Sequence, residues 1–146
     1  MKKILILLAF VLTLGISATA RDAYSHDAST LPQAAQATVK ANFKANISFI
    51  KAEKEIGRIS EYEVVLTDGT EISFDRHGNW KNIETARDKA VPKVFIPSAI
   101  TDYVAKNHHG VKITGIEKER SGFEVELANG IDMKFDKNGK FIRYDD

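Results

Sequence analysis

Two segments of the chain share one pattern of apolar and polar residues, 61 positions apart. The first reads VVLTDGTEISFDRHGNW from Val64, and the second reads VELANGIDMKFDKNGKF from Val125. In both, a run of alternating residues is followed by Asp-Gly or Asn-Gly and then by a second alternating run. Alternation with a period of two predicts half-buried antiparallel strands, and the Asp-Gly and Asn-Gly pairs predict hairpin turns.

The alternation also predicts which side chains face the core. The inward set is Tyr62, Val64, Leu66, Ile72 and Phe74 in the first segment, and Phe123, Val125, Leu127, Met133 and Phe135 in the second. Because successive side chains of a strand point to opposite faces, the residues between them face outward. The outward set includes Glu63, Val65, Glu71, Ser73, Glu124, Glu126, Asp132 and Lys134.

A helix and a strand are predicted before each of these segments. The first helix opens at Leu31-Pro32 and the second at Ile96-Pro97, and apolar residues then recur with helical spacing. Gly110 supplies a stop for the second helix. Further strands are predicted from Ile47 and Val111, and short final strands from Trp80 and Phe141.

These elements predict an α+β fold built as a tandem repeat. Each unit would be one helix plus a four-stranded antiparallel meander, with both helices packed on one face of a shared sheet. The units would be residues 31–84 and 96–146, joined by a linker at 85–95. A unit of about 50 residues has too small a core to be stable alone, so the two units are predicted to form a single domain.

The two copies differ in the loop before the opening segments. Glu55 and Tyr62 are seven positions apart, whereas Glu119 and Phe123 are four positions apart. The first copy is therefore predicted to have a longer hairpin loop, residues 56–61, which contains Arg58.

The N-terminus has the three-part layout of a secretory signal peptide. Two lysines precede an apolar run, and Ala18-Thr19-Ala20 forms a small-residue cleavage site. Residues 1–20 are predicted to be removed, and residues 21–30 to form a flexible leader. The protein is therefore predicted to be periplasmic or secreted, without a stable membrane anchor after cleavage.

Charge and cysteine content narrow the possible functions. Without residues 1–20 the chain has 19 basic and 20 acidic side chains, a net charge of −1. Nucleic-acid binding needs a concentrated basic face, so no nucleic-acid partner is predicted. The chain has no cysteine, which excludes thiol catalysis and thiolate metal sites. We predict a monomer.

The repeated pattern resembles a known family. Leu/Ile-Pro opens each helix, and aromatic-x-Val-x-Leu-x-Asp/Asn-Gly-x-x-Ile/Met-x-Phe-Asp-x-x-Gly-x-aromatic spans Tyr62 to Trp80 and Phe123 to Phe141. This is similar to the PepSY-like, beta-lactamase-inhibitor-like family of secreted bacterial proteins, over Leu31 to the C-terminus. The resemblance implies tandem helix-plus-four-strand units, a location outside the inner membrane, and a binding or inhibitory role without catalysis.

The residues that could carry chemistry have structural explanations. His26, His77, His108 and His109 are spread over a leader, a turn and one adjacent pair, so no metal site is predicted. Asp75 and Asp136 both begin Asp-x-x-Gly turns, where a carboxylate bonds to its own turn. No nucleophile elbow, zinc-binding helix or phosphate loop is present. We predict no enzyme activity and no cofactor.

The outward sheet residues are the remaining candidate site. We predict a binding surface that consists of Glu63, Val65, Glu71, Ser73, Glu124, Glu126, Asp132, Lys134 and Arg58. Its partner would be an unidentified protein or peptide, and inhibition of that partner stays open. The alternative is a small-ligand carrier or sensor that uses a groove between the two repeats.

Overall fold

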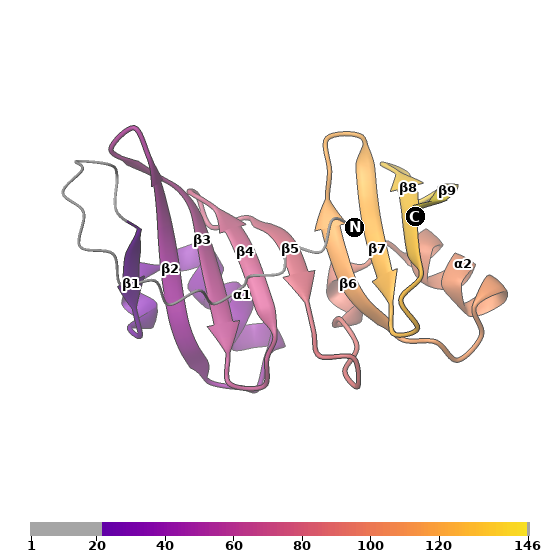
Figure 1. Cartoon of the computed structure of the whole chain (residues 1–146), viewed down its shortest axis with the longest axis horizontal. Helices are drawn as coiled ribbons and strands as arrows, with labels where there is room; N and C mark the ends of the chain where they lie inside the picture. The colour runs from indigo at the N-terminus through magenta and orange to yellow at the C-terminus, as the bar shows by residue number, and fades with distance from the viewer. Residues whose placement is uncertain (1–21, 146) are drawn as a thin grey trace.

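The computed structural model describes residues 22–145, and the predicted signal peptide, residues 1–20, lies outside this range. The described chain contains strands, α-helices and short 3₁₀-helices (Figure 1). In chain order they are β1 (Ala23–Ser25), η1 (Ala28–Thr30), α1 (Gln33–Asn42), β2 (Ile47–Glu55), β3 (Arg58–Leu66), β4 (Glu71–Asp75), β5 (Trp80–Glu84), η2 (Lys93–Phe95), α2 (Ser98–Asn107), β6 (Ile113–Lys118), β7 (Gly122–Leu127), β8 (Asp132–Asp136) and β9 (Phe141–Asp145).

The strands form one nine-stranded sheet in which each strand pairs antiparallel with the next along the chain. β5 pairs directly with β6, with Ile83 opposite Ile116, so the sheet continues without a break. The predicted tandem repeat, with a helix and a four-stranded meander in each unit and both helices on one face of a shared sheet, is therefore wrong. The α+β class holds, because two helices accompany the sheet.

The ninth strand comes from the segment that we predicted as a flexible leader. In β1, Ala23 lies opposite Ala52 of β2, and Ser25 lies opposite Ile50. Without β1, the middle of β2 would present its backbone N–H and C=O groups as an open sheet edge. Residues 23–25 therefore complete the sheet at this edge, which the polar composition of the leader did not indicate.

The core lies along the inward positions of the strands, as the alternation predicts. Eleven strand side chains are at most 1% exposed: Ile50, Val64, Leu66, Ile72, Phe74, Ile83, Ile116, Val125, Leu127, Met133 and Phe135. The inward assignment of the opening segments is confirmed, although Phe123 is only partly buried.

Each helix contributes a short apolar stripe to the same core. Ala35 and Val39 of α1 are buried, and so are Ile100 and Val104 of α2. Pro32 and Pro97 occupy the N-cap positions, where a missing N–H costs no helical hydrogen bond. Among residues 22–145, no helix is long and apolar enough to cross a membrane.

The β2–β3 hairpin extends beyond its neighbours. Its ladder continues to the pair Glu55 and Arg58, whereas β4 pairs with β3 only as far as Glu61. The turn consists of Ile56 and Gly57, both with positive φ. Residues 56–61, predicted as a long loop, thus form a two-residue turn and the start of β3.

Candidate binding surface

The strand register brings eight of the nine predicted site residues together on the outer face of the sheet. They occupy two rows that cross the strands. The first row is Lys51, Glu63, Ser73, Asn82, Glu117, Glu124, Lys134 and Arg143. The second row is Val65, Glu71, Glu84, Gly115, Glu126, Asp132 and Asp145.

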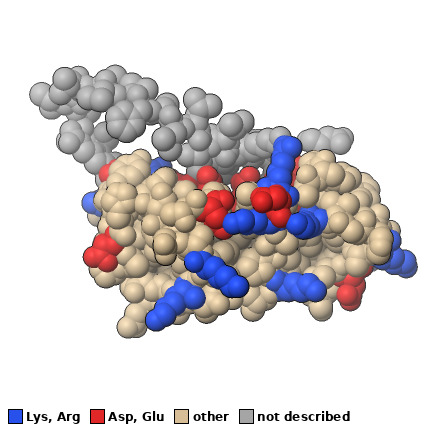
Figure 2. Space-filling view, turned by 90° about the horizontal axis from the view of Figure 1, so that it is seen from below, with Lys and Arg blue, Asp and Glu red and all other residues tan. Residues whose placement is uncertain are grey.

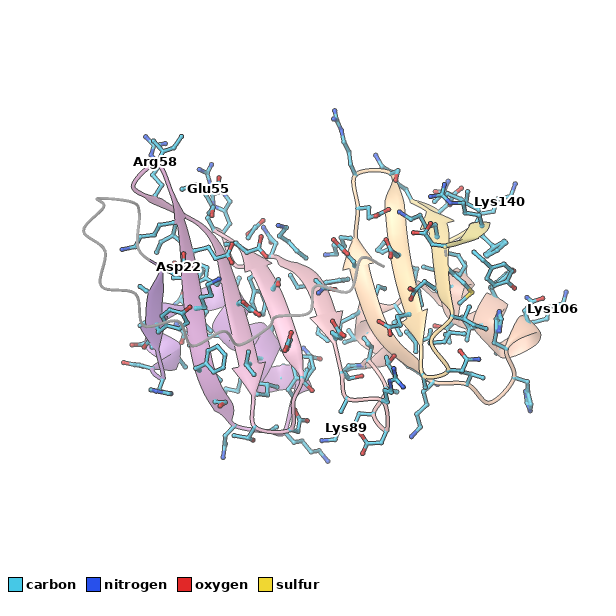
Figure 3. All side chains as sticks on the ribbon, viewed as in Figure 1. Asp22, Glu55, Arg58, Lys89, Lys106 and Lys140 are labelled. Carbon is cyan, nitrogen blue, oxygen red and sulfur yellow. The ribbon has the colours of Figure 1, made fainter. Side chains whose placement is uncertain are left out.

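Arg58 does not join the other predicted site residues. It lies at the end of the β2–β3 hairpin beside Glu55, at the opposite end of the sheet from Lys89 (Figure 3). Three acids of these two rows, Glu84, Glu117 and Asp145, are absent from the predicted set. The alternation in β5, β6 and β9 could have identified them, because it extends the same outward positions to these strands.

The second row contains five carboxylates and no basic side chain. We call these five residues the acidic row; they are Glu71, Glu84, Glu126, Asp132 and Asp145. Gly115 interrupts the row on β6 and adds no side chain. Side chains that face each other on adjacent strands have Cβ atoms roughly 5 Å apart, so the carboxylates form a nearly continuous band of negative charge.

Several carboxylates of the outer face stand directly opposite one another. Among residues 22–145, six cross-strand pairs join two acids: Glu53 with Glu61, Glu61 with Asp75, Glu71 with Glu84, Glu117 with Glu124, Glu126 with Asp132, and Asp132 with Asp145. Like charges in facing positions destabilise a sheet by roughly 0.2–1 kcal/mol per pair. The arrangement concentrates negative charge on this face, and Lys81 forms an ion pair with Glu61 within it.

Lysines offset part of this repulsion at the two ends of the sheet. Lys134 Nζ lies 3.0 Å from Glu119 Oε1, 3.3 Å from Glu124 Oε2 and 3.7 Å from Asp145 Oδ2. At the other end, Lys51 Nζ lies 2.8 Å from Glu53 Oε1. Hydrogen bonding to Glu119 raises the pKa of Lys134, which keeps this side chain charged.

The acids near the middle of the sheet hold their protons more tightly than usual. Burial raises the pKa of Glu63, and the nearby charge of Glu71 raises it further. Burial also raises the pKa of Glu117, with the charges of Glu124 and Glu119 adding to the effect. A cation from a partner would favour the ionised form of these groups and would be attracted by them in return.

Asp75 and Asp136, two of the side chains that could carry chemistry, stabilise turns. Asp75 Oδ1 accepts hydrogen bonds from the backbone N–H groups of His77 and Asn79, and Asp136 Oδ1 accepts them from Asn138 and Lys140. Both aspartates are thus turn residues, as predicted. Burial opposes ionisation of Asp75, but the hydrogen bonds from Asn79 and His77 outweigh it and lower the pKa.

The histidines lie in separate places. His26 contacts the backbone oxygen of Ser48 at 2.6 Å, His77 accepts a hydrogen bond from Arg76, and His108 lies 3.1 Å from the Tyr144 hydroxyl. Within residues 22–145, no group of three or more His, Asp or Glu side chains is arranged to hold a metal ion.

A small cavity of about 230 Å³ lies beside α2, but it is not a groove between the predicted repeats. All of its lining residues fall within 90–113, which is the end of the linker, α2 and the start of β6. Drug-sized ligand pockets are typically about 300–1,000 Å³, so this cavity is small for a carrier site.

An ion pair fastens the linker to the sheet: Lys89 Nζ lies 2.8 Å from Asp68 Oδ2. The hydrogen bond from Lys89 is the main reason that the pKa of Asp68 falls from 3.8 to about 2. Since the folded-state pKa is the lower one, the stabilisation is present above pH 4 and is lost as the pH falls from about 4 to 2. Figure 2 shows the face of the molecule that is at the bottom of Figure 1. On this face, lysine and arginine side chains are scattered and do not form one patch.

We predict that Asp68→Asn lowers the free energy of unfolding by about 0.5–1 kcal/mol at pH 7, a modest loss because solvent screens this partly exposed pair. At pH 2, where about half of the Asp68 carboxyl is protonated, the loss should be much smaller. Asparagine keeps an oxygen that can accept the hydrogen bond from the Thr70 N–H. Urea unfolding at both pH values measures the difference, with Asp102→Asn on the exposed face of α2 as the control. A loss that is equal at the two pH values would contradict the ion-pair explanation.

The architecture and the surface define a class of protein: a small α+β domain with an open antiparallel sheet whose outer face is rich in carboxylates. The family described as "Putative beta-lactamase-inhibitor-like, PepSY-like" matches residues 60–143, and the chain belongs to this family. The predicted family is therefore confirmed. No curated protein sequence matches the chain.

Solved structures from two Bacteroides species share the fold. A "putative periplasmic protein of unknown function" from Bacteroides vulgatus is 36% identical with a TM-score of 0.80, and the alignment covers 86% of this chain and 100% of that one. A "putative calcium-regulated periplasmic protein" from Bacteroides thetaiotaomicron is 32% identical with a TM-score of 0.78, covering 86% and 97%. A second B. vulgatus protein, described as a "putative periplasmic protein", is 32% identical, with a TM-score of 0.76 and the same coverage.

These neighbours confirm the predicted periplasmic location. Neither the family nor these three neighbours carry the description of an enzyme. The protein is a periplasmic protein of the PepSY-like family.

Proposed function

We propose that the protein binds another protein or a peptide through the outer face of its sheet, and that this partner presents a basic surface. The observation that carries the proposal is the set of six facing acid–acid pairs, which includes three pairs within the acidic row. These pairs concentrate negative charge on the outer face, and this charge attracts a cationic partner.

The shape of the surface favours a macromolecular partner over a small ligand. The acidic row spans β4 to β9, and its carboxylates lie on five of these six strands, with roughly 5 Å between neighbouring strands. Only an extended peptide or a protein surface reaches all of them at once. Charge of this kind raises the rate of association and makes binding sensitive to salt.

The test is a charge reversal that leaves the repulsion inside the sheet unchanged. In Glu71→Lys/Glu84→Lys, two facing acids become two facing lysines, so the like-charge pair persists while its sign changes. The tagged mature chain and this variant are used to recover partners from periplasmic extract at low and high salt. We expect recovery to fall at least about tenfold in the variant, because like charges across an interface repel strongly.

A matched control carries the same change of charge away from the sheet. Asp88→Lys/Asp102→Lys alters the linker and α2, both outside the outer face, and is expected to recover partners as the unmodified chain does. Equal recovery by the face variant and the unmodified chain would contradict the proposal. If no protein is recovered and native mass spectrometry finds a bound small molecule, the carrier alternative replaces it.

A further inference from the structure

The turn of the β2–β3 hairpin combines two unfavourable features in one residue. Ile56 has a φ of 48°, and it is the only residue other than glycine with positive φ among residues 22–145. Its side chain is also 100% exposed. A β-branched residue is strained in this left-handed conformation, and an exposed isoleucine gains nothing from burial in the core.

Other turns of the sheet avoid this combination. At the β3–β4 and β7–β8 turns, the residues with positive φ are Gly69 and Gly130. A two-residue turn with positive φ at both positions favours Asn-Gly or Asp-Gly. Because asparagine at position 56 would suit the turn better, the requirements of the turn do not account for isoleucine.

The position of the turn makes the side chain accessible to a partner. β1 reaches only to Ala52 on one side of the hairpin, and β4 reaches only to Glu61 on the other. The residues between them pair only across the hairpin, so the tip projects past the sheet (Figure 3). Glu55 and Arg58 flank the turn with opposite charges.

We propose that the side chain of Ile56 inserts into an apolar pocket of the protein partner, with Arg58 contacting the rim of that pocket. This inference rests on the proposed function, in which the outer face binds a basic protein, and adds a second requirement for that partner. Strain at an exposed position is a recognised sign of a functional contact. Buried apolar anchors and arginines carry a large share of interface energy, whereas charged surfaces act mainly on the association rate.

A protein pocket suits this tip better than a lipid surface or a second copy of the chain. A single myristoyl chain gives only marginal membrane binding, and an isoleucine side chain is far smaller. The acidic face beside the hairpin would also be repelled by anionic lipids and by the same face of a second copy.

The first experiment places a photo-crosslinking benzoylphenylalanine at position 56 and, as a control, at Asn129 in the exposed β7–β8 turn. Irradiation in periplasmic extract is expected to give one major protein adduct from position 56 and none from position 129. Mass spectrometry then identifies the adduct. No adduct from position 56, or an adduct with another copy of this chain, overturns the proposal.

The second experiment uses the identified protein in purified form. We expect Ile56→Asn to weaken its binding about 30-fold or more, chiefly by faster dissociation, and Ile56→Leu to weaken it by less than about fivefold. The melting temperature of Ile56→Asn should rise by a few degrees, because asparagine relieves the strain. Opposite changes in affinity and stability exclude misfolding as the cause.

Failure of this inference can be separated from failure of the proposed function. If Ile56→Asn binds within about threefold of the unmodified chain while Glu71→Lys/Glu84→Lys loses binding, the pocket is excluded and the acidic face stands. If neither variant loses binding, both proposals are wrong.

Discussion

Gly122→Ala is expected to lower the free energy of unfolding by about 3 kcal/mol or more, the larger of two effects at glycines in the second half of the sheet. A Cβ atom at position 122 would lie 2.0 Å from the backbone oxygen of Phe135 and 2.6 Å from the carbonyl carbon of Asp136. These atoms belong to β8, the strand that pairs with β7 at this residue. They can move only if the ladder between the two strands opens.

The matched control is Gly130→Ala, in the turn between the same two strands. Gly130 has a φ of +85°, but a Cβ atom there would meet nothing within 4 Å. The control therefore costs only the left-handed backbone, about 1–2 kcal/mol. Urea unfolding of both variants, followed by the fluorescence of the single tryptophan, Trp80, gives the two values. Losses that agree within about 0.5 kcal/mol would show that the close approach of β8 does not matter.

The sequence predicts which strand residues face inward, but it does not predict how the strands join. The alternation identified the inward residues because each strand buries one face, and that requirement is local. How the strands join is not local. The direct pairing of β5 with β6, and the addition of β1 to β2, depend on sheet edges that the repeated pattern does not describe.

The candidate site shows the same difference between local features, which the sequence predicts, and non-local ones, which it does not. Period two predicted that Glu71, Glu126 and Asp132 face outward, yet it could not predict which acid stands opposite which. That depends on register, and register shifts occur where Phe74 meets Trp80 and between Ile113 and Gly115. The alignment of the acidic row therefore depends on these shifts.

One feature of the sequence indicates the hairpin tip: the segment from Glu55 to Tyr62 is three positions longer than the matching segment of the second copy. Additional residues at this place favour a loop, and the structure uses them to lengthen both strands and to form a turn at Ile56 and Gly57. The strained conformation of Ile56 could not be predicted, because Ile-Gly is not a preferred pair for such a turn.

Phe135→Ala is expected to destabilise the protein by about 3–5 kcal/mol, the cost of removing a buried phenylalanine and leaving a cavity. Phe135 is 1% exposed and lies next to the last residue of β8. Its ring packs in edge-to-face arrangements with Tyr103 from α2 and Phe141 from β9, with ring centroids 5.5 Å and 5.8 Å apart, so it connects the sheet with the helix. Tyr103 and Phe141 stack on each other at 4.6 Å and cannot both move into the vacated space without losing this contact.

Phe135→Leu is the control that separates the cavity from the loss of aromatic contacts. Leucine fills most of the volume but makes no ring contact with Tyr103 or Phe141, so we expect a loss of about 1–2 kcal/mol. Denaturant unfolding of the two variants at pH 7 provides the comparison. If alanine and leucine cost the same, the rings carry the stability and the cavity does not. If neither costs more than about 1 kcal/mol, the second half of the sheet contributes less to the cooperative core than its burial indicates.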